Sequence, residues 1–116
     1  MSKRIEYEES SGNVFADLGV SDPEEALLKS DLAIRISQLI EERHLTQKEA
    51  AKVLGVAQPN ISNLVRGELR GFTVERLMRF LMALGQNIFV VVRPQTTPSD
   101  RAHVKANFAD PLPLNP

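Results

Sequence analysis

The chain has 116 residues, of which 42% are hydrophobic and 25% charged, and its net charge is −1 at pH 7. These values are typical of one soluble globular domain, and the length is too short for two ordinary domains. The sequence has no run of about 18 apolar residues, which predicts no membrane span, and its polar N-terminal residues do not resemble a secretory signal. The absence of cysteine excludes disulfides and thiolate metal sites, and it fits the cytoplasm, where we expect the protein to act.

The charges are unevenly distributed along the chain. Residues 1–42 carry ten acidic and four basic side chains, whereas residues 43–79 carry seven basic and three acidic ones. A basic middle after an acidic lead indicates two surfaces with different partners. Ordinary scatter of solvated charges would give the same pattern, so charge alone does not separate these interpretations.

A first helix is predicted from about residue 22 to Arg43. Ser21 supplies a capping oxygen, Pro23 suits the first turn, and acidic residues follow near the positive end of the helix dipole. Apolar residues then repeat along one helical face, at Leu28, Leu32, Ile36, Leu39 and Ile40.

Two short helices are predicted next. Thr46 and Glu49 have the spacing of a capping box, and Gly55 suits the left-handed turn that ends a helix. The following helix spans 58–65, and it tolerates Pro59 because that residue lies in its first turn.

A fourth helix is predicted after a loop that Gly67 and Gly71 bracket. Thr73 caps this helix and Gly85 ends it. Its inward-facing residues are Val74, Leu77, Leu81 and Leu84.

The character of the sequence changes at Asn87–Arg93, which is β-branched and aromatic and stops at Pro94. This pattern predicts a strand, and the proline-rich, polar residues that follow predict a flexible tail. We therefore expect an extended acidic lead segment at 1–20, a helical domain with a C-terminal strand at 21–93, and a tail at 94–116.

Residues 47–66 have the steric pattern of a helix-turn-helix. Counting from Gln47, Ala51 takes the fifth position, where two helices cross closely, and Gly55 takes the ninth, where the turn needs a positive φ. The aliphatic residues that fill the space between the helices are Leu54, Val56, Ile61 and Leu64. Each feature is weak alone, but together they are fairly specific.

The segment LTQKEAAKVLGVAQPNISNLVRG resembles the Xre/Cro-type repressors, and the wider pattern from NVFADLG to LMALGQNIFVVVRP resembles their HigA-like antitoxin branch. The resemblance covers residues 12–94. It implies a mainly α fold, a lambda-repressor-like domain of four to five helices with one C-terminal strand. It also implies repression of transcription at an inverted-repeat operator in double-stranded DNA. The antitoxin branch further implies a small basic toxin, an mRNA endonuclease, as a partner.

The docking that this resemblance implies places one polar helix in the major groove. Glutamine and asparagine amides can pair with adenine, while alanine or proline can contact a thymine methyl group. A residue at the start of the preceding helix and nearby cations would bind phosphates. The expected base-contacting residues are Ala57, Gln58, Pro59, Asn60 and Asn63, and the expected phosphate-contacting residues are Gln47, Lys48, Arg66 and Arg70.

One position pair departs from this family. Relatives often hold a buried Arg–Glu pair between the first helix and the recognition helix, and the matching positions here are Ile40 and Val65. We expect an apolar pair in its place, which need not weaken the core.

The expected strand has no second strand of comparable strength to pair with. We expect it to pair with the same strand of a second copy across a two-fold axis, which would satisfy both backbones in a homodimer. Pairing with N-terminal residues or with the toxin remains an alternative. The residues of the expected dimer strand are Ile88, Phe89, Val90, Val91 and Val92.

We expect residues 1–31 to form most of the toxin contact and not to be needed to build the helix-turn-helix. Two alternatives to the antitoxin hypothesis remain open: a phage-type regulator without a toxin, and a protein-binding module that no longer contacts DNA. Enzyme hypotheses are weaker. Glu41 and His44 have the spacing of one di-iron ligand pair, but the sequence lacks the second pair, so we expect no catalytic residues, metal or cofactor.

Overall fold

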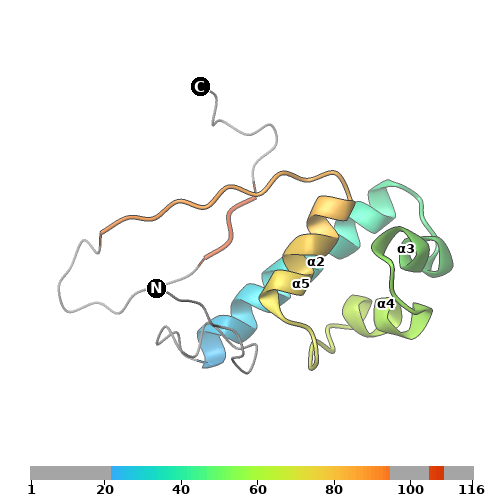
Figure 1. The fold of residues 1–116 in the computed structure, drawn as a ribbon. Coiled ribbons are helices and arrows are strands. Elements are labelled where there is room, and N and C mark those ends of the chain that lie inside the picture. Colours follow the sequence, from blue (N-terminus) through green and yellow to red (C-terminus); the bar gives the residue numbers. More distant parts are fainter. Residues whose placement is uncertain (1–21, 95–104, 109–116) are drawn as a thin grey trace, which may run out of the picture.

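The computed structural model describes residues 22–94 and 105–108. This part contains four helices, which are α2 (Asp22–Glu42), α3 (Gln47–Leu54), α4 (Gln58–Val65) and α5 (Val74–Ala83). They confirm the four predicted helices, and α2 ends one residue before the expected position. Ser21, the expected cap of the first helix, lies outside the described residues. Figure 1 shows α5 lying alongside α2, with α3 and α4 packed together beside them.

One apolar core holds the four helices together. The predicted face of α2 is buried, as are the predicted inward residues of α5. Ile36, Ile61 and Leu77 are completely inaccessible, so α2, α4 and α5 meet at the centre. No polar or charged side chain is buried among the described residues. Burial of apolar surface therefore supplies the stability of this part of the chain.

The expectation that residues 1–31 are not needed to build the domain is wrong. Residues 22–31 form the first half of α2, and Leu28 is buried in the core. Removing them would take away part of the surface against which α5 packs. Residues 1–21 lie outside the described residues.

Thr46 and Glu49 form the predicted capping box at the start of α3. The Thr46 hydroxyl accepts from the Glu49 amide at 3.0 Å, and the Glu49 carboxylate accepts from the Thr46 amide at 2.8 Å. Thr73 caps α5 in a similar way, because its hydroxyl accepts from the Arg76 amide at 3.1 Å. Both caps satisfy amides that the first turn of a helix leaves without a backbone partner.

All four described helices end with the same hydrogen-bond pattern, the Schellman motif. In each, an amide beyond the helix donates to a carbonyl five residues earlier. These bonds run from Leu45 to Ile40, from Val56 to Ala51, from Glu68 to Asn63 and from Gln86 to Leu81, at 2.8–3.1 Å. The residue before the donor takes the left-handed conformation. It is glycine after α3, α4 and α5, but after α2 it is His44, with φ 56°.

The C-terminal ends of α2 and α5 are joined by a side chain. The Arg43 guanidinium donates to the carbonyl oxygen of Leu84, which lies just after α5. A Cβ atom at Gly85 would lie 2.9 Å from the same guanidinium group. A side chain at Gly85 would therefore require the Arg43 guanidinium to shift, and the φ of 82° favours glycine there independently.

The predicted C-terminal strand is not formed within the part of the chain that the structure describes. Residues 86–94 leave α5 as extended backbone without regular secondary structure, and no backbone hydrogen bond joins 87–94 to another described segment. A strand needs a second strand, and the described residues offer none. Of the expected tail, residues 105–108 are described, and Ala106 packs against the core.

We expect His44→Gly to raise the free energy of unfolding by about 0.5–1 kcal/mol. A side chain with a Cβ atom is strained in the left-handed region, and relief of that strain exceeds the extra chain entropy that glycine loses on folding. Urea denaturation would measure the change. His44→Ala is the control, because it removes the imidazole and keeps the Cβ atom. An equal gain for alanine would show that the imidazole, and not the backbone, is responsible.

Candidate nucleic-acid interface

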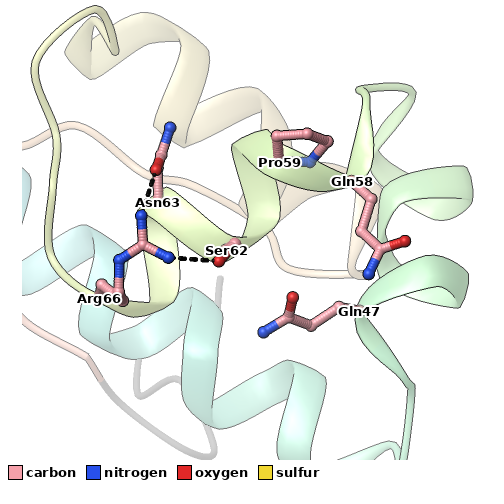
Figure 2. Close-up of a pocket in the computed structure, with 6 residues that line it drawn as sticks. All are labelled: Gln47, Gln58, Pro59, Ser62, Asn63 and Arg66. Carbon is pink, nitrogen blue, oxygen red and sulfur yellow. Dashed lines mark hydrogen bonds between the residues drawn. The ribbon is translucent and has the colours of Figure 1, made fainter.

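Six side chains line a shallow depression of about 450 Å³ on the exposed face of α4 (Figure 2). Gln47 enters it from the first turn of α3, and the other five lie on or just after α4. The lining is polar apart from one proline ring. It consists of Gln47, Gln58, Pro59, Ser62, Asn63 and Arg66. The structure thus brings together part of both predicted sets, the base-contacting and the phosphate-contacting residues.

The remaining predicted residues lie around this depression. Ala57 is the N-cap residue of α4 and is exposed, and Asn60 is half-buried. Lys48 is exposed on α3, and Arg70 is exposed in the loop after α4. None of these four lines the depression.

The packing of α3 against α4 sets the position of this surface. Ala50 and Ala51 are buried on α3, and Ile61 and Leu64 are buried on α4. The small alanines allow the two helices to approach closely, and a larger side chain would force them apart. Gly55 makes the turn between them with φ 72°, as predicted. Sequence analysis identified Ala51, but it missed Ala50, which has no exposed surface.

The start of α4 has no side-chain cap. Ala57 offers no acceptor, and Pro59 has no amide proton. The Asn60 amide donates to the Ala57 carbonyl at 2.9 Å, but the Gln58 amide has no acceptor among the described residues. A free amide at the positive end of a helix dipole favours an approaching anion or base acceptor.

Arg66 makes three hydrogen bonds along the edge of the depression. Its Nη1 donates to Ser62 Oγ at 2.5 Å, and its Nη2 donates to Asn63 Oδ1 at 2.7 Å. The same Nη2 donates to Glu68 Oε1 at 3.3 Å. Sequence analysis missed this network and the role of Ser62. The signal was present, because Asn63 and Ser62 precede Arg66 by three and four residues, a spacing that places side chains together on a helix.

Phe72 anchors the loop that carries Arg70. Its ring is buried and lies edge-on to the Phe80 ring, with 6.1 Å between centroids. The Arg76 guanidinium lies 5.0 Å from the Phe72 ring centroid and 5.5 Å from the Phe80 centroid. This stack holds the loop against α5, so Arg70 stays close to the end of α4.

Residues 14–93 match the family model described as "Helix-turn-helix domain". A solved structure described as "Putative XRE Family Transcriptional Regulator" is 37% identical, with a TM-score of 0.72, and the match covers 77% of this chain and 100% of that one. The chain belongs to the Xre-type helix-turn-helix family. Among curated proteins, no sequence match was found.

The helix-turn-helix differs from expectation at Val65. Ile40 is buried, but Val65 is exposed to solvent, so the two do not form a buried apolar pair. Val65 lies beside Ile34 and Leu69 along the edge between α2 and the end of α4. The core under α4 is closed by Ile61 and Leu64 instead.

In residues 22–94 and 105–108, no group of three or more His, Cys, Asp or Glu side chains is placed to hold a metal ion. The helices of that same part are too short or too polar to cross a membrane. Glu41 and His44 are both exposed at the end of α2.

Proposed function

We propose that this protein is a sequence-specific DNA-binding transcriptional repressor that places α4 in the major groove. The observation that carries the proposal is the polar depression on the exposed face of α4, at the second helix of an Xre-type helix-turn-helix. The relative that is 37% identical bears the description of a transcriptional regulator, which supports the same function.

The size and chemistry of α4 suit the groove. An α-helix with its side chains is about 10–12 Å across, which matches the width of about 12 Å of the major groove of B-DNA. Gln58 and Asn63 offer amides to base edges, and Ala57 and Pro59 offer apolar contacts to thymine methyl groups. Asn60 and Asn63 are both half-buried, but only Asn63 lines the depression, so Asn60 would reach a base edge at the rim of the contact.

Phosphate contacts would come from the sides of this helix. Gln47 begins α3, where the helix dipole favours an anion, and Lys48 follows it with an exposed ammonium. Arg70 lies on the other side of α4 in the anchored loop. Such contacts fix the position of the protein on the duplex and do not by themselves select a sequence.

Two substitutions test this docking. Asn63→Ala should cost about 1–3 kcal/mol at the preferred operator and relax specificity at one base pair. Arg70→Ala should weaken binding to all sequences similarly. It should also reduce the salt slope, which is the slope of log K for DNA binding against log salt concentration, by about one unit, because one phosphate contact is lost. Gel shifts over a salt series would measure both effects, on a duplex selected from a random pool. Gln38→Ala removes an exposed amide from α2 and is the control.

The docking fails if both variants lose affinity equally on specific and random DNA without a change in salt slope. A wild-type protein that binds no duplex at low salt would favour a module that binds only proteins.

We also propose that the repressor is a homodimer joined through residues 87–93. Phe89 and Val91 are more than half exposed, and Val90 and Val92 are 78% and 87% exposed. Apolar side chains on extended backbone without a partner are unfavourable in water. Pairing with the same segment of a second copy would satisfy both chains and cover this surface. A two-fold axis would also place two α4 helices about one DNA turn, roughly 34 Å, apart.

Sedimentation of the free protein tests the dimer. We expect a dimer at tens of micromolar, and we expect Val90→Pro to shift it toward monomer, because proline removes a donor and disfavours a strand. Val53→Ala, which removes an exposed aliphatic side chain from α3, is the control and should leave the dimer intact. A wild-type monomer at that concentration would contradict the proposal.

We further propose that the repressor is the antitoxin of a toxin–antitoxin pair. The flanks that resemble HigA-like proteins support this role, as does the excess of acidic residues in 1–42, which suits a small basic toxin. Because Leu28 is part of the core, we assign the toxin contact to residues 1–20 and to Asp22, the exposed acidic residue in the first turn of α2. A phage-type regulator without a toxin is the alternative.

Co-expression tests the antitoxin role. A neighbouring gene product that is small and basic should be toxic alone and harmless with the full chain. Deletion of residues 1–20 should abolish this rescue and leave a folded domain that still melts cooperatively. Full rescue by the shortened chain would place the contact elsewhere. A neighbour that neither binds nor harms the cell would favour the phage-type alternative.

A further inference from the structure

We propose that Arg66 is a positioning residue that determines which base Asn63 recognises. This inference rests on the proposed binding of α4 in the major groove. It assigns Arg66 a role different from the phosphate contact expected from the sequence. The guanidinium would act within the protein, by fixing the direction in which the Asn63 amide faces DNA.

The Arg66 guanidinium donates hydrogen bonds to three side chains. Nη2 uses its two protons on Asn63 Oδ1 and Glu68 Oε1, and Nη1 uses one on Ser62 Oγ. The two partners on α4 belong to the exposed face that forms the depression (Figure 2). A planar guanidinium bonded to neighbouring acceptors is held in one orientation, which a flexible ammonium group would not reproduce.

The charge of Arg66 is also partly balanced. Glu68 forms an ion pair with it at 3.3 Å, and both side chains remain more than half exposed. A phosphate that approached Arg66 would meet the Glu68 carboxylate as well, and it would have to compete for protons that are already bonded. Arg70 makes no such bonds among the described residues, so it is the better phosphate ligand of the two.

The Arg66 bond sets the direction of the Asn63 amide. Nη2 is a donor, so the group that faces it must be the amide oxygen, because two donors cannot bond. Figure 2 shows the Asn63 oxygen toward Arg66 and the nitrogen pointing away from it. The Asn63 oxygen is therefore engaged by Arg66, while its N–H donors point away from Arg66.

This orientation selects among bases. Guanine shows two acceptors in the major groove, N7 and O6, and thymine shows the acceptor O4. Adenine shows an N6 donor beside N7, and its bidentate recognition needs the asparagine oxygen as well as the nitrogen. With its oxygen turned toward Arg66, Asn63 can still donate to adenine N7 but no longer pairs with N6, whereas guanine offers two acceptors to its N–H groups. Asn63 therefore favours guanine over adenine. The adenine pairing that the sequence alone predicts for Asn63 is thereby disfavoured.

The test is selection from a random duplex pool with the full chain, followed by sequencing. The base pair that Asn63 contacts is identified as the position at which the wild type selects a base and the Asn63→Ala variant does not. We expect the wild type to prefer guanine there by about tenfold over adenine. Arg66→Met should remove this preference or turn it toward adenine, with little change in salt slope. Arg66→Lys should weaken the preference too, although it keeps the charge.

Arg70→Ala is the matched control, and it should keep the base preference while the salt slope falls by about one unit. The inference is overturned if the wild type prefers adenine at that pair. It is also overturned if Arg66→Met keeps the base preference. A third contrary outcome is that Arg66→Lys behaves as wild type while Arg66→Met lowers the salt slope, because Arg66 would then act as a charge that binds phosphate. A wild type that selects no sequence at all contradicts the proposed function itself, and this inference falls with it. Arg66→Lys decides the outcome if Arg66→Met does not fold.

Discussion

The close crossing of α3 and α4 is the constraint on which the candidate interface depends. Two buried alanines on α3 let Ile61 and Leu64 of α4 reach the core, and this leaves the opposite face of α4 in solvent. Because that face is fixed by packing and not by polar contacts, Gln58, Ser62 and Asn63 are not needed for the fold. Substitutions at these three positions should therefore leave the fold intact, while larger residues at the alanines or a Cβ atom at Gly55 should not.

The ends of the helices show why local structure could be predicted well from this sequence. Thr46, Glu49 and Gly55 act through bonds to residues within five positions, so their chemistry is visible in the sequence itself. The end of α2 follows the same Schellman pattern, but His44 stands where the other three helices have glycine. No local rule selects histidine there. The bond from Arg43 to Leu84, which joins the ends of α2 and α5, holds this region in place through a contact that sequence spacing does not reveal.

The features that sequence analysis missed or misjudged depend on surroundings outside a short window. Val65 is a core-type side chain four residues after the buried Ile61, but it is the last residue of α4 and lies exposed at the end of the helix. Residues 87–93 have the composition of a strand, and strand formation requires a partner that the described part of the chain does not contain. Leu28 lies in a segment whose acidic neighbours suggested an independent surface, but the helical repeat that it begins commits that segment to the core.

The charge of the helix-turn-helix bears on the proposed homodimer. Glu68 offsets Arg66, so the cations left beside α4 for phosphate contacts are chiefly Lys48, Lys52 and Arg70. Few phosphate contacts give weak binding at physiological salt, and a protein with net charge −1 gains little from general attraction to DNA. Two helix-turn-helix motifs in one dimer would bind the same duplex in a single association, and they would double the number of phosphate contacts. The helix α5 is suited to make that connection, because the loop before it carries Arg70 and the extended segment 86–94 follows it. The packing of α5 along α2 would then set how closely Arg70 of one copy approaches the DNA phosphates. It would also set the distance between the helix-turn-helix motifs of the two copies.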